Sequence, residues 1–328
     1  MIDTIYIEES VRDHARTREI CNRYKDAKII YCRQYTEIFN RKAQNFRIQK
    51  QNPALILARK FKNFVLPAPE SYGIGSSKNY YFSHMLNCLY DCRYCFLQGM
   101  YRSAFYVLFV NYEDFQDEII DINNKSGEDT WFFTGYDCDS LALEPVTGFM
   151  EFFSPFFKNI TGARFELRTK STQVSTLLSQ TPLDNCVVAF SLSPDSIARA
   201  LEHRAPTLEK RINAIKKLQH AGWQIGLRFD PVIYMDGYKE VYSDFFRKVF
   251  SQIDAPSLHS VSLGAFRLPE TYFKNIRKIF PDELLFAGPL EKRSGMVSYE
   301  KQFESQLLEF CESSILDYVS DEIYFPCV

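Results

Sequence analysis

Residues 207–229 read TLEKRINAIKKLQHAGWQIGLRF, a helix pattern followed directly by a strand pattern. Thr207 is a suitable N-cap, and Gly222 lies where a helix would end. One face between them carries the apolar residues Leu208, Ile212, Ile215 and Leu218. This spacing predicts a helix over Leu208–Ala221. The run Gln224–Phe229 then predicts a buried strand, so the stretch is typical of one helix–strand step of an α/β fold.

The same alternation extends along the chain in both directions. We predict further strands over Tyr80–Met85, Phe105–Val110, Thr130–Thr134, Arg164–Thr169, Cys186–Ser191 and His259–Leu263. Amphipathic segments lie between them, over Tyr112–Asn123, Val146–Phe156 and Tyr238–Ile253. Repeated strand–helix units imply parallel strands joined by right-handed crossovers. We therefore expect an α/β fold, a partial (β/α)6 TIM-type barrel with a small N-terminal extension, and chemistry at the carboxyl ends of its strands.

Three regions are expected along the chain. Residues 1–75 form a basic N-terminal region with helical patches over Val11–Tyr24 and Tyr31–Phe46, and the Pro and Gly residues from Pro67 to Gly75 mark its end. Residues 76–300 form the barrel. Residues 301–328 form a C-terminal helix and tail that pack on it, with the helix expected over Tyr299–Tyr318.

Composition excludes several classes of protein. Of the 328 residues, 46% are hydrophobic and 24% are charged, as in ordinary globular proteins. No apolar run approaches the ~18 residues of a membrane span, and the N-terminus lacks the pattern of a signal peptide, so we expect a cytoplasmic protein with no membrane partner. Nine cysteines are too sparse for a disulfide framework, so free, catalytic or metal-bound thiols are expected.

Positive charge is concentrated near the N-terminus. Residues 11–62 contain 14 Lys or Arg and four acidic residues, an excess of ten positive charges, whereas the whole chain has a net charge of −2. Such a segment fits either a phosphate-binding surface or solvated helix faces. Two arginines near predicted strand ends, Arg228 and Arg267, are further candidates for phosphate contacts.

Three cysteines follow the strand predicted over Tyr80–Met85, in the order Cys88-Leu-Tyr-Asp-Cys92-Arg-Tyr-Cys95. Three thiolates on one short loop can hold three irons of a [4Fe–4S] cluster and leave the fourth iron open for another ligand. Zinc is the alternative metal, but structural zinc sites have four ligands, and the only nearby fourth candidate is His84. A third interpretation is three buried cysteines that bind nothing.

The motif C-x3-C-x2-C at the first strand of a barrel resembles the radical S-adenosylmethionine superfamily. Further stretches resemble one branch of it, the spore photoproduct lyases and DNA repair photolyase-like proteins. They are residues 92–98 (CRYCFLQ), 138–144 (CDSLALE), 167–170 (LRTK) and 189–193 (AFSLS), together with the order Glu202, Arg211, Gly222. The resemblance covers about residues 80–235. It implies a [4Fe–4S] cluster on Cys88, Cys92 and Cys95 with S-adenosylmethionine at the open iron.

The resemblance also implies roles for single residues. Lys170 lies where the family contacts the S-adenosylmethionine carboxylate, and Ser191 corresponds to a serine near the cofactor. Tyr94 and Phe96 flank the last cysteine, where family aromatics pack against cofactor and substrate, and Tyr94 is also a candidate catalytic residue. For each of these positions, ordinary surface exposure or core packing is the alternative interpretation.

Two positions depart from the family pattern. Tyr136 stands where the family has a cysteine that returns a hydrogen atom to the product radical, and Cys138 follows two residues later. Phe96 replaces a tyrosine of the family's proposed radical relay, and phenylalanine has no O–H. Our hypothesis is that Cys138 or Tyr136 is the hydrogen donor, or that the final step differs. A buried small residue is the alternative for Cys138.

The resemblance thus implies a lyase that cleaves the C–C crosslink of an ultraviolet-induced thymine lesion in DNA, with a flavodoxin- or ferredoxin-type electron donor. A radical S-adenosylmethionine enzyme acting on a tRNA base, a peptide or a metabolite is the alternative. A non-catalytic, zinc-bearing nucleic-acid-binding protein is a third hypothesis.

Overall fold

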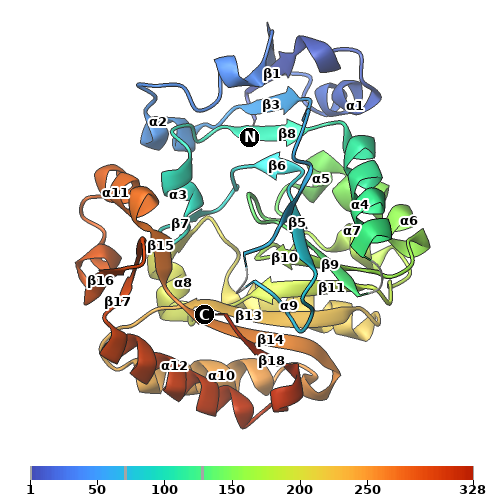
Figure 1. Ribbon diagram of the computed structural model, residues 1–328. Coiled ribbons are helices and arrows are strands. Elements are labelled where there is room, and N and C mark those ends of the chain that lie inside the picture. Colours follow the sequence, from blue (N-terminus) through green and yellow to red (C-terminus); the bar gives the residue numbers. More distant parts are fainter. Residues whose placement is uncertain (1, 70–71, 127–128, 328) are drawn as a thin grey trace.

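The predicted strand–helix alternation forms an eight-stranded sheet in the computed structural model, which describes residues 2–69, 72–126 and 129–327 (Figure 1). The strand order is β18-β14-β13-β11-β10-β9-β5-β4. The bounds are β4 Val65–Pro67, β5 Asn79–Phe82, β9 Thr130–Thr134, β10 Ala163–Thr169, β11 Cys186–Ser191, β13 Gln224–Val232, β14 Leu258–Ala265 and β18 Tyr324–Pro326. Neighbouring strands from β5 to β14 are all parallel. Strand β4 joins antiparallel at one edge and β18 joins parallel at the other, which confirms a partial barrel with six consecutive parallel strands at its centre.

Helices follow the barrel strands, and most of them cover the outside of the sheet (Figure 1). Their bounds are α5 Glu144–Thr147, α6 Phe149–Asn159, α7 Ser175–Leu178, α8 Asp195–Leu201, α9 Leu208–His220, α10 Tyr238–Phe250, α11 Glu270–Ile279 and α12 Lys301–Leu316. Helix α9 has the predicted ends to within one residue, since the Thr207 side chain accepts a hydrogen bond from the Lys210 N–H, and Gly222 has φ +91°. That φ lies in the left-handed region, which favours glycine. None of the helices in these described residues is long and apolar enough to cross a membrane.

A second sheet forms at the N-terminus, with the order β2-β1-β3-β8-β6. Its strands are β1 Thr4–Glu8, β2 Lys28–Cys32, β3 Leu55–Ala58, β6 Met85–Leu86 and β8 Tyr106–Phe109. Its helices are α1 Ala15–Arg23 and α2 Phe46–Gln51. Strands β1, β2, β3 and β8 are parallel, and only β6 is antiparallel to its neighbour.

Two predictions for this part of the chain are wrong. The helix over Tyr31–Phe46 is replaced by the end of β2, a 3-10 turn over Tyr35–Glu37 and the start of α2, because Lys28–Cys32 pairs along β1. The strand over Phe105–Val110 exists as β8 but lies in the N-terminal sheet rather than in the barrel, because it pairs with β3. The N-terminal sheet therefore takes two strands from beyond residue 75, and the three-region division of the chain stays a prediction.

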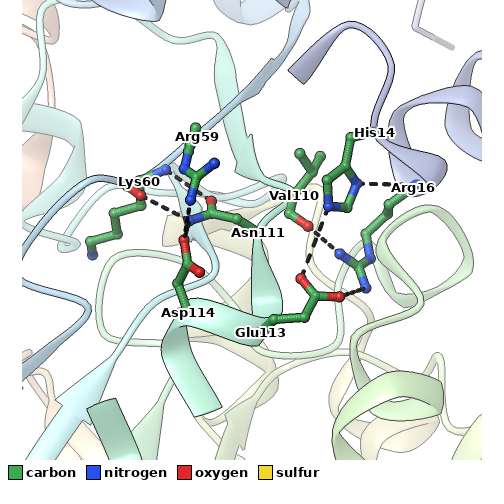
Figure 2. Close-up of polar contacts among 8 residues, drawn as sticks. All are labelled: His14, Arg16, Arg59, Lys60, Val110, Asn111, Glu113 and Asp114. Carbon is green, nitrogen blue, oxygen red and sulfur yellow. Dashed lines mark hydrogen bonds and ion pairs between the residues drawn. The ribbon is translucent and has the colours of Figure 1, made fainter. Parts of the chain in front are cut away.

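Ion pairs tie the carboxyl edge of this second sheet to the start of α4, Tyr112–Ser126 (Figure 2). Arg16, in the first turn of α1, lies 3.5 Å from the Glu113 carboxylate, and Arg59, just after β3, lies 3.0 Å from that of Asp114. The Asn111 side chain accepts a hydrogen bond from the Lys60 N–H and donates one to the Lys60 carbonyl oxygen. Open α/β sheets often bind ligands at this edge, between strands such as β1 and β3 whose connections run in opposite directions. Here the side chains at that edge already contact one another.

Two small sheets complete the frame around the site. Strand β7, Asp91–Cys92, pairs antiparallel with β12, Glu202–His203. Strands β15 Arg267–Pro269, β16 Leu290–Arg293 and β17 Met296–Tyr299 form an antiparallel sheet. Helix α3, Leu97–Met100, packs closely on α11 at Gly99, which has no side chain. Any other residue there would place its Cβ against the Tyr272 carbonyl oxygen.

Candidate active site

A cavity of about 560 Å³ lies at the carboxyl ends of the barrel strands. This is the place where barrels of this kind hold their active sites. All of the residues singled out from the sequence as site residues line it: Cys88, Cys92, Tyr94, Cys95, Phe96, Tyr136, Cys138, Lys170 and Ser191. They come from the loop after β6, from the segments after β9 and β10, and from the end of β11.

The cysteine loop is a built structure rather than an open coil. Cys92 lies in β7, and the Cys95 N–H donates to the Cys92 carbonyl at 3.1 Å. The Tyr90 N–H points at the Cys88 sulfur at 3.4 Å. Burial raises the pKa of all three thiols, that of Cys88 to about 12. A positively charged metal centre would offset this burial, because a coordinating thiol is deprotonated outright.

The ligands available near the motif favour a cluster over a structural zinc ion. Among the residues that the structure describes, no three Cys, His, Asp or Glu side chains are gathered closely enough to hold one metal ion. A [4Fe–4S] cluster binds each thiolate to a different iron, so its ligands lie farther apart than those of a single zinc ion. His84, the candidate fourth zinc ligand, stacks on Phe149 with ring centroids 4.1 Å apart and does not line the cavity. The donor set therefore fits the cluster and not a four-ligand zinc site.

Two buried charged side chains hold the loop from opposite sides. The Lys50 ammonium of α2 donates to the carbonyl oxygens of Cys88 at 2.9 Å and of Tyr90 at 3.1 Å. On the barrel side, Glu202 pairs with Cys92 through the backbone, and its carboxylate accepts a hydrogen bond from the Tyr94 hydroxyl. Sequence reasoning missed Lys50, because nothing near residue 50 indicates a contact with a loop 38 residues later.

Glu202 is the centre of a buried polar network. Its carboxylate also accepts from the Arg211 guanidinium and, at 3.0 Å, from the Ser193 hydroxyl. Burial opposes ionisation, but Lys170 and Arg211 outweigh it and hold the pKa of Glu202 below its usual value. Since the Tyr94 hydroxyl is engaged in this network, the ring of Tyr94 is held in place in the cavity wall.

Lys170 presents a cation to the cavity. Its backbone N–H donates to the Asp139 carboxylate at 2.6 Å, and its ammonium lies 5.5 Å from the centre of the Tyr94 ring. Burial alone would lower the pKa of Lys170, but the nearby Cys92 and Glu202 outweigh this effect and raise it. Within the described part of the chain, the ammonium has no hydrogen-bonded or ion-paired partner. A carboxylate-bearing ligand would supply one.

Tyr136 and Cys138 lie in the cavity wall beyond the end of β9. The Tyr136 ring stacks on Tyr81 with centroids 4.3 Å apart and lies 5.4 Å from that of Phe96. Cys138 is buried, and burial raises the pKa of its thiol well above the usual value. The pKa of Tyr136 is raised in the same way. Both groups therefore keep their hydrogen at neutral pH.

The two arginines expected to meet phosphates have different environments. Arg228 is fully buried and its Nη2 lies 2.6 Å from the Glu166 carboxylate, so this prediction is wrong for Arg228. Burial opposes ionisation of Glu166, but Arg228 and Arg168 outweigh it and lower its pKa to about 2. The side chain of Arg228 thus balances a carboxylate inside the barrel. Arg267 lines the cavity and donates to the Cys327 carbonyl oxygen at 2.8 Å.

Comparisons with known proteins agree with this geometry. A family model described as spore photoproduct lyase matches residues 1–293. The chain is 23% identical over 332 residues to a spore photoproduct lyase of Clostridium acetobutylicum, covering 96% of this chain and 95% of that one. It is also 23% identical over 338 residues to the Bacillus subtilis protein of that name, covering 98% and 95%.

Solved structures of spore photoproduct lyase share the fold. A mutant with bound AdoMet and dinucleoside spore photoproduct superposes with a TM-score of 0.88 at 17% identity, over 100% of this chain and 98% of the other. A structure complexed with dinucleoside spore photoproduct gives a TM-score of 0.85 with the same coverage. Because the family model matches well over half of the chain, the chain belongs to the spore photoproduct lyase family of radical S-adenosylmethionine enzymes, which use a [4Fe–4S] cluster.

Proposed function

We propose that this protein cleaves the C–C crosslink of an ultraviolet-induced thymine lesion in DNA. One observation carries the proposal: a single cavity gathers the three cluster cysteines, the Lys170 ammonium and a layer of aromatic rings. Relatives spanning nearly the whole chain carry the name spore photoproduct lyase, and solved structures with the same fold hold the dinucleoside spore photoproduct. The cavity volume of about 560 Å³ lies within the usual range for small-molecule sites.

Cys88, Cys92 and Cys95 would hold the cluster, and the Lys170 ammonium would bind the carboxylate of S-adenosylmethionine. When bound, these cofactors supply a 5′-deoxyadenosyl radical that abstracts a hydrogen atom from the lesion. Two residues of the cavity wall would lie against the cofactor: Tyr94, whose hydroxyl donates to Glu202, and Ser191 at the end of β11. Tyr136 and Tyr81 would pack against the thymine rings, because aromatic side chains stack on bases.

The last step needs a hydrogen atom for the product radical, and Cys138 and Tyr136 are our two candidates. Both line the cavity, and both are held in their protonated forms by burial. Transfer would break an S–H or O–H bond, form a C–H bond on the released thymine and leave a thiyl or tyrosyl radical. Phe96 has no hydroxyl and cannot take part in such a transfer.

The electron for each activation would come from a flavodoxin- or ferredoxin-type protein, and we place the enzyme in the cytoplasm. The preference for the thymine lesion over a tRNA base, a peptide or a metabolite comes from the relatives, so the substrate must be tested directly. A radical enzyme with a different substrate would share the cluster and the cofactor site.

The test uses protein reconstituted anaerobically with iron and sulfide, then reduced with S-adenosylmethionine and irradiated thymine-rich DNA. Mass spectrometry quantifies 5′-deoxyadenosine and the digested nucleosides together. Loss of the lesion with gain of thymidine is the expected result. Formation of 5′-deoxyadenosine with unchanged DNA would reject this substrate. Cys92→Ala is the control without a complete cluster, and Cys311→Ala is its match, because Cys311 is a buried thiol in α12, which does not line the cavity.

Cys138→Ala and Tyr136→Phe, assayed separately, identify the hydrogen donor. Loss of the donor should slow lesion repair, because the product radical then lacks the S–H or O–H bond from which it takes a hydrogen atom. It should also divert the product radical, so that less thymidine forms per 5′-deoxyadenosine. If both variants keep the wild-type product ratio, neither residue is the donor.

A further inference from the structure

Six exposed basic residues lie in or near α2, α3 and α11, and α3 and α11 form part of the cavity wall. We call them the basic ridge: Arg41, Lys42, Arg47, Arg102, Arg277 and Lys278. Leu97 and Met100 of α3 and Tyr272 of α11 line the cavity itself, so the ridge borders the proposed active site. Figure 1 shows α2, α3 and α11 along the same side of the molecule.

Hydrogen bonds and ring contacts join the three parts of the ridge. The Arg102 N–H donates to the Asn40 side chain at 2.7 Å, which places the Arg41–Lys42 segment beside the residues that follow α3. The rings of Phe39 and Tyr101 pack there with centroids 5.0 Å apart. On the other side of α3, the Asn275 side chain donates to the Gly99 carbonyl at 2.9 Å. That hydrogen bond brings α11, with Arg277 and Lys278, against the same helix.

None of the six ridge cations forms an ion pair with a carboxylate among the described residues. Other exposed basic residues do form ion pairs: Lys274 on α11 lies 2.8 Å from Glu270, and Arg59, after β3, lies 3.0 Å from Asp114. Of the acidic residues near the ridge in sequence, Glu37 accepts from the Arg33 N–H and Glu283 lies 3.7 Å from Arg93, whereas Asp282 is exposed and forms no ion pair within the described residues. The ridge is therefore a group of exposed cations without a carboxylate partner among the described residues.

We propose that the basic ridge binds the phosphate backbone of duplex DNA on one side of the nucleotides that enter the cavity. Exposed Lys and Arg in a row release the counterions condensed on DNA, which is the main source of sequence-independent affinity. The chain outside residues 11–62 carries a net charge of about −12, so Arg102, Arg277 and Lys278 are cations in an otherwise acidic part of the sequence. The inference deepens the proposed function by naming where the flanking DNA lies.

The test measures binding of a fluorescent duplex of about 20 base pairs that carries no lesion, by anisotropy at several salt concentrations. The ridge variant is Arg41→Gln/Lys42→Gln/Arg102→Gln. The matched control is Lys210→Gln/Lys216→Gln/Lys217→Gln, which removes the same charge from exposed positions of α9, a helix that packs on β13. All six positions are exposed, so both variants should fold, and equal iron content after reconstitution checks this.

Removal of one phosphate-binding cation should reduce the slope of log K against log salt by about one. We expect the slope for the ridge variant to fall by about three and its binding to be at least about tenfold weaker near 100 mM salt, with the control within about twofold of wild type. Equal weakening of both variants would show that only net charge matters and would overturn the inference, as would wild-type binding by the ridge variant. Because the probe has no lesion, the result does not depend on lesion cleavage. Absence of cleavage by the wild-type enzyme would reject the proposed function alone.

Discussion

Removing the Arg211 charge should destabilise the fold around the cysteine loop. The Arg211 side chain is 1% exposed and donates to the Glu202 carboxylate, to the Ser191 carbonyl at 3.1 Å and to the Pro206 carbonyl at 2.8 Å. In Arg211→Met the Glu202 carboxylate stays buried with only the Tyr94 and Ser193 hydroxyls as donors. Breaking one partner out of a buried ion pair costs about 3–5 kcal/mol. We expect a decrease of this size in the free energy of unfolding.

The double variant Arg211→Met/Glu202→Gln separates charge from packing. It removes the carboxylate that has lost its hydrogen-bonded arginine, so it should be more stable than Arg211→Met alone by about 1–3 kcal/mol. The free energy of unfolding of the wild type and of both variants is measured by urea denaturation of the cluster-free protein. Unfolding is followed by the fluorescence of the buried residues Trp131 and Trp223. A cost below about 1 kcal/mol for Arg211→Met, or a double variant no more stable than the single one, would refute the reasoning.

The pH dependence of this effect has a fixed sign. In the wild type the pKa of Glu202 is held below its usual value of 4.5, so the carboxylate adds stability above pH 4.5 and that stability is lost as pH falls through the lower, folded-state pKa. Arg211→Met removes one cause of the depression. The difference in stability between wild type and Arg211→Met should therefore narrow as the pH falls below 4.5. A difference that widens in acid would contradict the assignment of Glu202 as a buried carboxylate.

Two further predictions concern Lys170 and His84. Lys170→Ala should weaken S-adenosylmethionine binding at least about tenfold while leaving the iron content unchanged, because a charge-assisted hydrogen bond contributes roughly 1.5–3 kcal/mol; calorimetry on the reconstituted enzyme measures this, and wild-type affinity would exclude the proposed contact. Burial lowers the pKa of His84 to about 3, so the neutral ring adds stability above the unfolded pKa of 6.5 that is lost as pH falls below it. Between pH 7 and pH 5 the free energy of unfolding of the wild type should fall by about 2 kcal/mol more than that of His84→Phe. If the urea midpoints of the two proteins change equally over that range, the prediction is wrong.

The local signals in the sequence were sufficient for the barrel. Helix α9 begins at the predicted residue and ends within one residue of the prediction, because its cap, its apolar face and its terminal glycine are all close in sequence. The strands β9 and β11 have the predicted bounds because each is a short apolar run with turn residues on both sides. The motif of Cys88, Cys92 and Cys95 points to a metal centre without any tertiary information, because three thiols fall within eight residues.

The N-terminal sheet could not be predicted in the same way. Strand β8 follows the cysteine loop in the chain, yet it pairs with β3, about 50 residues earlier. Lys28–Cys32 becomes a strand because it pairs with β1. The residues from Tyr31 onward, taken alone, predict a helix. Arg228 lies near the end of its strand in sequence, but its side chain turns to Glu166, 62 residues away. Each error comes from a long-range contact that overrides the local preference.

These long-range contacts hold the two sheets of this chain together around one site. The cysteine loop touches the N-terminal sheet region through Lys50, whose ammonium holds two carbonyl groups of the loop, and it touches the barrel through Glu202. Burial lowers the pKa of Lys50, and the nearby Cys88 and Asp91 oppose this effect. A thiolate cluster on the loop would add negative charge beside this ammonium and strengthen the contact. Loading of the cluster should therefore tighten the junction between the two sheets, so that the metal centre and the fold support each other.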